Sequence, residues 1–286
     1  MPRQFKDQLG YFTFAQNNKE TDYLRLAYLQ ALSLKRFMPK SLYAVAVDAE
    51  TKKQLTDTQK SIFDYVIDIP QNDAAEQNWK LNNEWKLYQL TPFKETIKVE
   101  ADLFFTRDIN HWINGFRTRD IILTTKIVNF RNEEVFDKIY RKQFIDNNLP
   151  MVYSGFSYFR YTKTMAEFFS ICKNLTIHWK EFTQTLKGEF SQPTTDVLYA
   201  LAAKMIGIEN CTNPILNYPK MVHMKGAING FESNADWTEK LYGQLDEDCN
   251  LLVGFTRQIY PFHYYIKDWP TKEFEEKYER CYRRVL

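Results

Sequence analysis

The chain has 286 residues, 38 of them basic and 36 acidic, for a net charge of +2. Because basic and acidic residues nearly balance, the whole protein is not strongly attracted to nucleic acid or lipid. A local basic patch can still exist at this net charge. The four cysteines lie far apart without a Cys-x-x-Cys spacing, which argues against a zinc site or a disulfide framework and favours free thiols in a reducing cytoplasm. No stretch is long and apolar enough for a transmembrane segment, so we expect a cytoplasmic protein without a membrane partner.

Strand and helix patterns alternate along most of the chain. Strands are expected over 11–15, 42–47, 65–69, 97–99, 121–125 and 151–160. Helices are expected over about 22–37, 51–62, 73–90, 108–116, 133–147, 164–179 and 194–206. This alternation predicts an α/β fold with a mostly parallel, Rossmann-like central sheet flanked by helices. Ligands are expected beyond the carboxyl ends of its strands.

Glu100 and Asp102 stand one residue apart between two apolar runs, 97–99 and 103–105. Carboxylates are almost never buried unless they are paired or bind a metal. Residues i and i+2 of a strand point to the same side, so these two acids can offer oxygen ligands to one hard cation. The alternative is a strand end whose acids face solvent.

Four further residues, at three places in the chain, can be explained either by function or by structure. Lys86, on the helix that leads toward the acid pair, belongs to a solvated face or reaches a donor phosphate. Ser154 and Gly155 interrupt a strand, which marks a β-bulge or the close approach of a ligand or another backbone. Asp196, in the first turn of a helix, complements the helix dipole or projects into the cleft as a catalytic or acceptor-binding carboxylate.

His223 lies in the segment KMVHMKG, close to Lys225 and Gly226. A lone histidine is more often structural than a ligand. Here the neighbouring ammonium group and the flexible glycine would suit an anionic oxygen bound to the same cation as the acid pair.

These features together resemble the GT-A-fold glycosyltransferases, most closely the glycogenin-like and galactosyltransferase-like group that uses nucleotide sugars with retention. The resemblance covers about residues 9–231. It implies a transferase domain over 1–235, with 236–286 as a helical and aromatic extension packed on it. It also implies Mn²⁺ or Mg²⁺ on the donor diphosphate, held by Glu100, Asp102 and His223. Two features depart from the family pattern: the first acid is Glu rather than Asp, and no Lys-Pro-Trp follows the histidine segment, which continues as AINGF.

The same resemblance implies where the donor, a UDP-sugar, would bind. Base and ribose fall at the ends of the first two strands, and Gly226 lies beside the diphosphate. The implied donor-binding residues are Phe14, Ala15, Gln16, Asn17, Asp48, Lys86, Glu100, Ala101, Asp102, Ser154, Gly155, Lys225 and Gly226. Asp196 and Gln192 are the implied catalytic positions, near the sugar or the acceptor, with Asp196 in a positioning or stabilising role.

The composition and the run DYLRLAYLQALSLK are also similar to glycosyltransferases of tailed bacteriophages, some of which modify hydroxymethylated cytosine. The favoured acceptor is hydroxymethylcytosine in double-stranded phage DNA, receiving glucose or arabinose in the host cytoplasm. A glycan or a protein is the alternative acceptor. The segment YPFHYYIKDW and the cations Lys277, Arg280, Arg283 and Arg284 can form a basic, stacking surface for DNA, or else an amphipathic helix that closes the fold.

Two other classes of protein stay open. A sugar nucleotidyltransferase would need a glycine-rich, basic loop after the first strand, and residues 15–20, AQNNKE, contain no glycine. A non-catalytic protein that binds a nucleotide sugar would keep the same fold without transferring the sugar.

Overall fold

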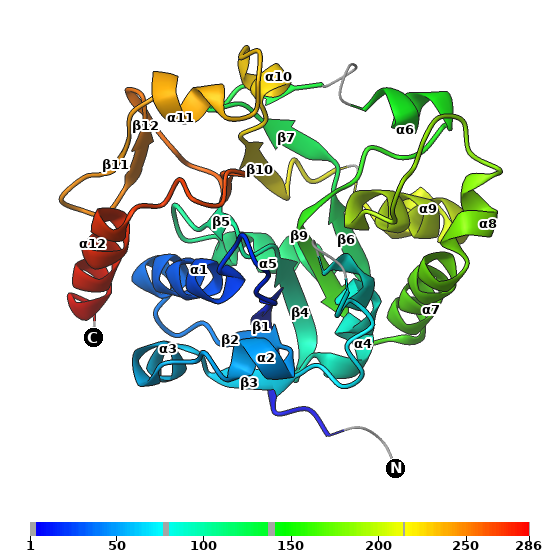
Figure 1. Cartoon of the computed structure of the whole chain (residues 1–286), viewed down its shortest axis with the longest axis horizontal. Coiled ribbons are helices and arrows are strands. Elements are labelled where there is room, and N and C mark those ends of the chain that lie inside the picture. Colours follow the sequence, from blue (N-terminus) through cyan, green and yellow to red (C-terminus); the bar gives the residue numbers. More distant parts are fainter. Residues whose placement is uncertain (1–3, 77–79, 137–140, 214, 286) are drawn as a thin grey trace.

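The computed structural model describes residues 4–76, 80–136, 141–213 and 215–285. Its centre is a six-stranded sheet in the order β3-β2-β1-β4-β9-β6 (Figure 1). The strands are β1 Asp7–Phe14, β2 Tyr43–Val47, β3 Tyr65–Asp68, β4 Phe93–Val99, β6 Ile121–Thr124 and β9 Tyr153–Arg160. Pairing is parallel among the first four strands, whereas β9 is antiparallel to both of its neighbours. The α/β class predicted from the sequence is confirmed.

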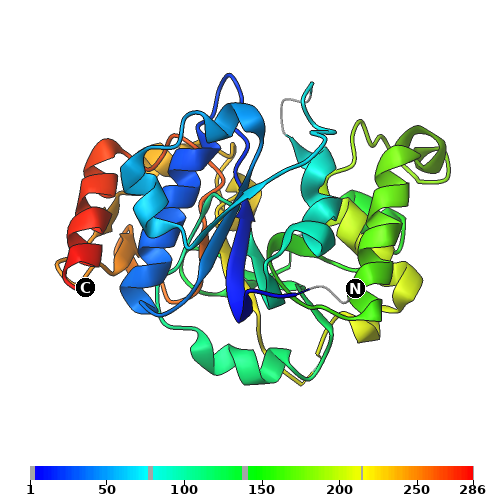
Figure 2. The ribbon, with the colours of Figure 1, turned by 90° about the horizontal axis from the view of Figure 1, so that it is seen from below.

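Helices cover both faces of this sheet (Figure 2). The largest are α1 Tyr23–Phe37 on one face and α7 Lys163–Ile177 and α9 Thr195–Ile206 on the other. Alternate residues of a strand point to opposite faces, so Tyr11 packs in the core with α1 and Phe12 in the core with α7 and α9. Asp22 caps α1, since its carboxylate accepts a hydrogen bond from the Arg25 amide at 3.0 Å.

A second sheet has the strand order β5-β14-β10-β7-β8. Its strands are β5 Leu103–Phe104, β7 Lys126–Val128, β8 Glu134–Val135, β10 Lys220–His223 and β14 Phe262–His263. The strand β14 comes late in the sequence, yet it lies between β5, which follows the acid pair, and β10, which ends at His223. The predicted extension, 236–286, therefore supplies an inner strand of this sheet.

Short strands and helices make the remaining connections. A third sheet contains β11 Gly243–Leu245, β12 Leu251–Val253 and β13 Thr256–Arg257. The other helices are α2 Ala49–Lys52, α3 Asp57–Ile62, η1 Leu81–Lys86, α4 Leu87–Leu90, α5 Asn110–Phe116, α6 Lys142–Asp146, α8 Trp179–Thr183, η2 Ile208–Asn210, α10 Gly226–Asn229, α11 Asp236–Lys240 and α12 Lys272–Arg283. Across the described ranges, none of the helices combines the length and the apolar character needed to cross a bilayer.

Three predicted helices differ from the structure, while the other predicted elements agree to within a few residues. The segment 51–62 is broken into two helices because Thr56 caps α3. The segment 73–90 holds a turn and then η1 and α4, since Lys80 has a left-handed backbone with φ of 53°. In 133–147, β8 pairs with β7 and only α6 is helical. Residues 77–79 and 137–140 of these segments lie outside the described part.

Two of the cysteines predicted to be free form a disulfide. Cys249, between β11 and β12, is bonded to Cys281 in α12, with their Cα atoms 6.2 Å apart. Cys172 and Cys211 are buried free thiols, as predicted. The bridge joins α12 to the small third sheet. A separation of 32 residues carries no spacing signal from which the pairing could be read.

Two aromatic residues of the segment 260–269, which was predicted to stack against DNA, are not available for stacking. Phe262 and Tyr264 are fully buried, because both side chains pack into the core under α12. On α12 the Lys277 ammonium group donates to the Leu245 carbonyl. The alternative prediction, an amphipathic helix that closes the fold, describes α12 correctly: its apolar side is buried and its N-terminal half pairs with α1 through Glu275.

Candidate active site

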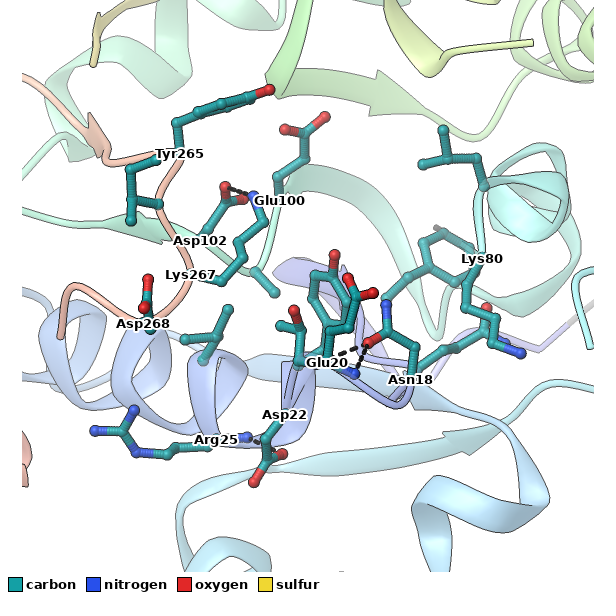
Figure 3. Close-up of a pocket in the computed structure, with 18 of the residues that line it drawn as sticks. Asn18, Glu20, Asp22, Arg25, Lys80, Glu100, Asp102, Tyr265, Lys267 and Asp268 are labelled. Atoms are coloured by element: carbon teal, nitrogen blue, oxygen red, sulfur yellow. Dashed lines mark hydrogen bonds and ion pairs between the residues drawn. The ribbon is translucent and has the colours of Figure 1, made fainter. Parts of the chain in front are cut away.

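A cavity of about 650 Å³ opens at the carboxyl ends of β1 and β4 (Figure 3). It is lined by the ends of these strands, the start of α1, the region of η1, and residues 265–268, which follow β14. The charged side chains in its described wall are six acids, Glu20, Asp22, Glu84, Glu100, Asp102 and Asp268, and three bases, Arg25, Lys80 and Lys267. A cavity of this size and place in an α/β sheet suits a small-molecule ligand.

Glu100 and Asp102, in the wall of this cavity, meet His263 behind them. His263 Nε2 is 3.0 Å from Asp102 Oδ2 and 3.3 Å from Glu100 Oε2. One ligand atom of each residue lies within 4.8 Å of the others. Neighbouring ligands of an octahedral ion are about 3 Å apart, so two oxygens and a nitrogen at these spacings fit a divalent metal. The acids stand at the carboxyl end of the fourth strand, as predicted, but they lie in the turn 100–102 between β4 and β5, so the strand geometry that was expected to point both to one side does not apply.

Strand pairing explains why His263 reaches the acid pair. Its antiparallel partner on β5 is Leu103, the residue after Asp102. Its parallel partner on β10 is His223. Paired residues lie side by side in neighbouring strands, so the order across the sheet is Leu103, at the end of the turn that carries the acids, then His263, then His223.

His223, the predicted third metal ligand, is buried and does not line the cavity. Its Nδ1 is 2.9 Å from Nδ1 of His263, and its Nε2 has no hydrogen-bond partner among the described residues. Burial, together with the nearby His263, lowers the pKa of the His223 imidazole well below its usual value. The ring is therefore neutral at pH 7. His263 takes the place beside the carboxylates that the sequence assigned to His223.

Lys267 approaches Asp102 from the cavity side and donates a short hydrogen bond to Oδ2 (Figure 3). Burial raises the pKa of the Asp102 carboxyl, but His263 and Lys267 outweigh burial and hold this pKa well below its usual range. Burial lowers the pKa of Lys267, and Asp102 more than offsets that effect, so the net pKa is raised. Both groups are charged at neutral pH. An ammonium group thus already neutralises part of the acid pair.

Glu100 is contacted on its other side by Ser154, which in turn contacts Asp196. Ser154 Oγ is 2.5 Å from Glu100 Oε1 and 2.6 Å from Asp196 Oδ1, and the Ser154 amide donates to the same Asp196 oxygen at 2.7 Å. Asp196 Oδ2 is 2.5 Å from Nη2 of the buried Arg141. Burial raises the pKa of the Asp196 carboxyl, but Arg141 and Ser154 outweigh it and lower this pKa. Asp196 is therefore ionised, and it reaches Glu100 indirectly, through Ser154.

Lys98 is a buried cation that the sequence analysis did not single out. It is 1% exposed, with Nζ 3.0 Å from Glu84 Oε2 and 3.9 Å from Glu100 Oε1. Burial raises the pKa of the Glu84 carboxyl despite Lys98 beside it. The sequence could have indicated this residue, because a lysine within an apolar strand, two residues before Glu100, requires a charged partner when it is buried.

Several residues predicted to bind the donor have other partners. Phe14, Gln16 and Ala101 line the cavity with the two acids, whereas Ala15, Asn17, Asp48, Lys86, Ser154, Gly155, Lys225, Gly226, Gln192 and Asp196 do not. Asp48 caps α2 and accepts from Gln16 at 3.0 Å, and Asn17 accepts from the Leu24 amide at 2.9 Å. Lys86 donates to the Pro70 and Gln71 carbonyls and pairs with Asp73 at 3.0 Å.

Gly155 and Gly226 were predicted to bind the donor, but close packing within the protein is enough to explain a glycine at both positions. A Cβ on Gly155 would lie 2.9 Å from Met221 Sδ, and a Cβ on Gly226 would lie 2.2 Å from the Ser233 carbonyl oxygen. The bulge expected near Gly155 is present, since the pairing of β6 with β9 shifts register there. Lys225 is buried with its ammonium group 4.4 Å from the centre of the Tyr265 ring, which lines the cavity.

His263 and Lys267 were not predicted as site residues, because the metal-binding histidine was expected at His223. The Lys-Pro-Trp that was sought after His223 has a counterpart in Lys267, Asp268 and Trp269, which follow His263 within the segment YPFHYYIKDW. The lysine and the tryptophan four and six residues after His263 were the features that could have indicated this histidine.

No family model and no curated protein matches this chain. Among solved structures, a galactosyltransferase LgtC with donor and acceptor sugar analogs is 12% identical, covering 68% of this chain and 70% of that chain with a TM-score of 0.45. Mouse xyloside xylosyltransferase 1 is 12% identical, covering 73% and 85%, with a TM-score of 0.43. The glycosyltransferase GlyE of Streptococcus pneumoniae TIGR4 is 12% identical, covering 72% and 44%, with a TM-score of 0.38. Scores this low carry no conclusion about activity, which rests on the site.

Proposed function

We propose that this protein is a metal-dependent glycosyltransferase of the GT-A type, moving a sugar from a nucleoside-diphosphate sugar to a hydroxyl acceptor. The observation that supports this most is the meeting of Glu100, Asp102 and His263 beside a cavity of about 650 Å³ at the end of β4. A mixed oxygen and nitrogen donor set favours Mn²⁺, with Mg²⁺ as the alternative. The proposed donor is a UDP-sugar.

The metal would neutralise charge that develops on the departing nucleoside diphosphate. Glu100 and Asp102 would each contribute an oxygen to it, and His263 would contribute Nε2. Lys267 remains protonated in this site, so its ammonium group is suited to bind a phosphate oxygen beside Asp102. Lys225, behind the Tyr265 ring, is a second candidate for that role.

We infer a supporting role for Asp196, which orients Ser154 and through it Glu100. Gln192, on the loop before α9, is proposed to act near the sugar or the acceptor. Transfer with retention is part of the proposal and is read out as the anomer of the product.

Donor and metal are tested by thermal unfolding with Mn²⁺, Mg²⁺ and a panel of nucleoside diphosphates and their sugars. A ligand at 100 times its Kd adds about 2.7 kcal/mol to the free energy of unfolding, so we expect UDP with Mn²⁺ to raise Tm by about 5 °C. We expect Asp102→Asn and His263→Ala to abolish the shift produced by Mn²⁺. Asp146→Asn, an exposed carboxylate of α6, is the matched control. Equal Mn²⁺ shifts in all four proteins would contradict the metal site.

The proposed acceptor is hydroxymethylcytosine in double-stranded DNA, receiving glucose or arabinose. Exposed Arg280 and Arg283 on α12 are the cations offered to its backbone. Labelled donor is incubated with hydroxymethylated DNA, unmodified DNA, glycans and proteins, and the labelled product is identified. Label on a glycan or protein alone would replace DNA as the acceptor. Release of pyrophosphate from a nucleoside triphosphate would instead identify a nucleotidyltransferase.

A further inference from the structure

His223 and His263 stack side by side from paired positions of β10 and β14. Their ring centroids are 4.9 Å apart, their planes meet at 28°, and their Nδ1 atoms are 2.9 Å apart. Two ring nitrogens at that distance form a hydrogen bond only if one carries the proton and the other accepts it. The tautomers of the two rings are therefore linked, and the surroundings determine which ring donates.

An ionised carboxylate only accepts hydrogen bonds, so a metal held by the acid pair, and not the acid pair alone, would determine the direction of this bond. Nε2 of His263 faces Asp102 at 3.0 Å and Glu100 at 3.3 Å. A histidine that binds a metal offers a lone pair on the ligating nitrogen and keeps its proton on the other one. With Nε2 as the ligand, His263 must carry its proton on Nδ1. The acceptor of that proton is Nδ1 of His223, whose own proton then lies on Nε2.

The second ring nitrogen of His223, Nε2, makes no interaction within the described part of the chain that would require a histidine at this position. This nitrogen is buried and has no hydrogen-bond partner among the described residues. Burying a polar atom without a partner costs free energy, so an apolar side chain would be favoured here if packing were the only requirement. The contact with His263 is the polar interaction that offsets this cost.

We propose that His223 is a positioning residue for the metal site, whose Nδ1 accepts the Nδ1–H of His263 and leaves the His263 Nε2 lone pair free for the metal position beside Glu100 and Asp102. This inference rests on the proposed function, because it assigns His223 a role toward the same metal. Histidine ligands commonly donate to a carboxylate or a carbonyl. A neutral imidazole performs that task here without adding a negative charge beside two acids.

Close packing keeps both rings in this arrangement. The backbone at Gly155 borders the His263 ring, since a Cβ there would lie 3.5 Å from Nδ1, in ordinary van der Waals contact. On the other side, the Tyr153 ring meets His223 edge-on with centroids 5.8 Å apart. His223 and His263 are 4% and 5% exposed.

The test compares Mn²⁺ and Mg²⁺ affinities, measured by calorimetry, of the unsubstituted protein, His223→Phe and His223→Asn. Phenylalanine keeps the ring and removes the acceptor, whereas the asparagine oxygen can replace Nδ1 as acceptor. We expect His223→Phe to weaken Mn²⁺ binding about 10- to 100-fold and His223→Asn to recover most of that loss. Mn²⁺ depends more on a nitrogen ligand than Mg²⁺, so the ratio of the two affinities should also fall in His223→Phe.

Nitrogen-15 NMR of the histidines in the Mg²⁺-bound, unsubstituted protein reports the protonated nitrogens without any variant. We expect a proton on Nδ1 of His263 and on Nε2 of His223. A proton on Nε2 of His263 in that state, or unchanged Mn²⁺ affinity and ratio in a folded His223→Phe protein, would overturn the inference while leaving the metal site intact. If the unsubstituted protein binds neither ion, the proposed function fails and the inference falls with it.

Discussion

A single hydroxyl group connects Asp196 to the acid pair. Ser154 Oγ lies within 2.6 Å of a carboxylate oxygen on either side, yet it has only one proton to donate. Only one of the two carboxylates can receive that proton at a time, so the other must find its positive partner elsewhere. Asp196 finds it in Arg141, and Glu100 lies 3.9 Å from the ammonium group of Lys98.

We expect Asp196→Asn to lower the free energy of unfolding at pH 7 by about 3 kcal/mol, because it removes the charged partner of buried Arg141. The pKa of Asp196 is lowered in the folded protein from an ordinary value of 3.8. Its stabilising effect is therefore fully present above about pH 4 and is lost as the pH falls through the folded pKa.

Urea unfolding of both proteins between pH 7 and pH 3 tests this expectation. The difference between them should be largest at neutral pH and should shrink below about pH 4. A difference that stays constant over that range would mean that the Asp196 charge is not what stabilises the fold.

At the scale of elements, α12 is held to the fold by three kinds of contact. Its side chains pack on α1, its Glu275 pairs with Arg25 at 2.7 Å, and its Cys281 is bonded to Cys249. The bonded pair encloses β14 and the segment after it, which carry His263 and Lys267. The disulfide therefore closes a loop around the C-terminal contribution to the site.

We expect the double variant Cys249→Ser, Cys281→Ser to lose about 3 to 4 kcal/mol of unfolding free energy, since a bridge across 32 residues restricts the unfolded chain. Denaturant titration of the oxidised protein and the variant measures the loss. Thiol counting on the unfolded protein is the control. Two reactive thiols without reductant and four with it are expected, and four in both cases would contradict the bridge.

Elements whose pattern lies within one segment of the sequence could be predicted, whereas elements that depend on pairing with distant strands could not. The strands β1 to β4 and the helix α1 were readable because their apolar patterns and caps lie within one segment. Of the site, the acid pair could be predicted from the sequence, and the residues on and after β14 could not. The acid pair is a local signal, but β14 is two residues long, and its place between β5 and β10 depends on pairing with strands about 160 and 40 residues away. A strand that short has no periodicity to detect.

The whole molecule builds its site from distant parts of the chain. The start of α1, the region of η1, the turn after β4 and the segment after β14 all line one cavity. Residues 236–286 were predicted to be an extension of the transferase domain, a boundary that stays a prediction. Whatever the boundary, these residues provide both His263 and Lys267.

The charges in the cavity wall have a consequence for the order in which ligands bind. With six acids against three bases in the described wall, a nucleoside diphosphate would enter a negative field. A divalent cation is attracted by that field and reverses it locally. We therefore expect compulsory order, with the metal first and the nucleotide second. Calorimetry should detect Mn²⁺ binding without UDP but no UDP binding without a divalent ion, and equal UDP affinity in the presence of EDTA would show that the order is random.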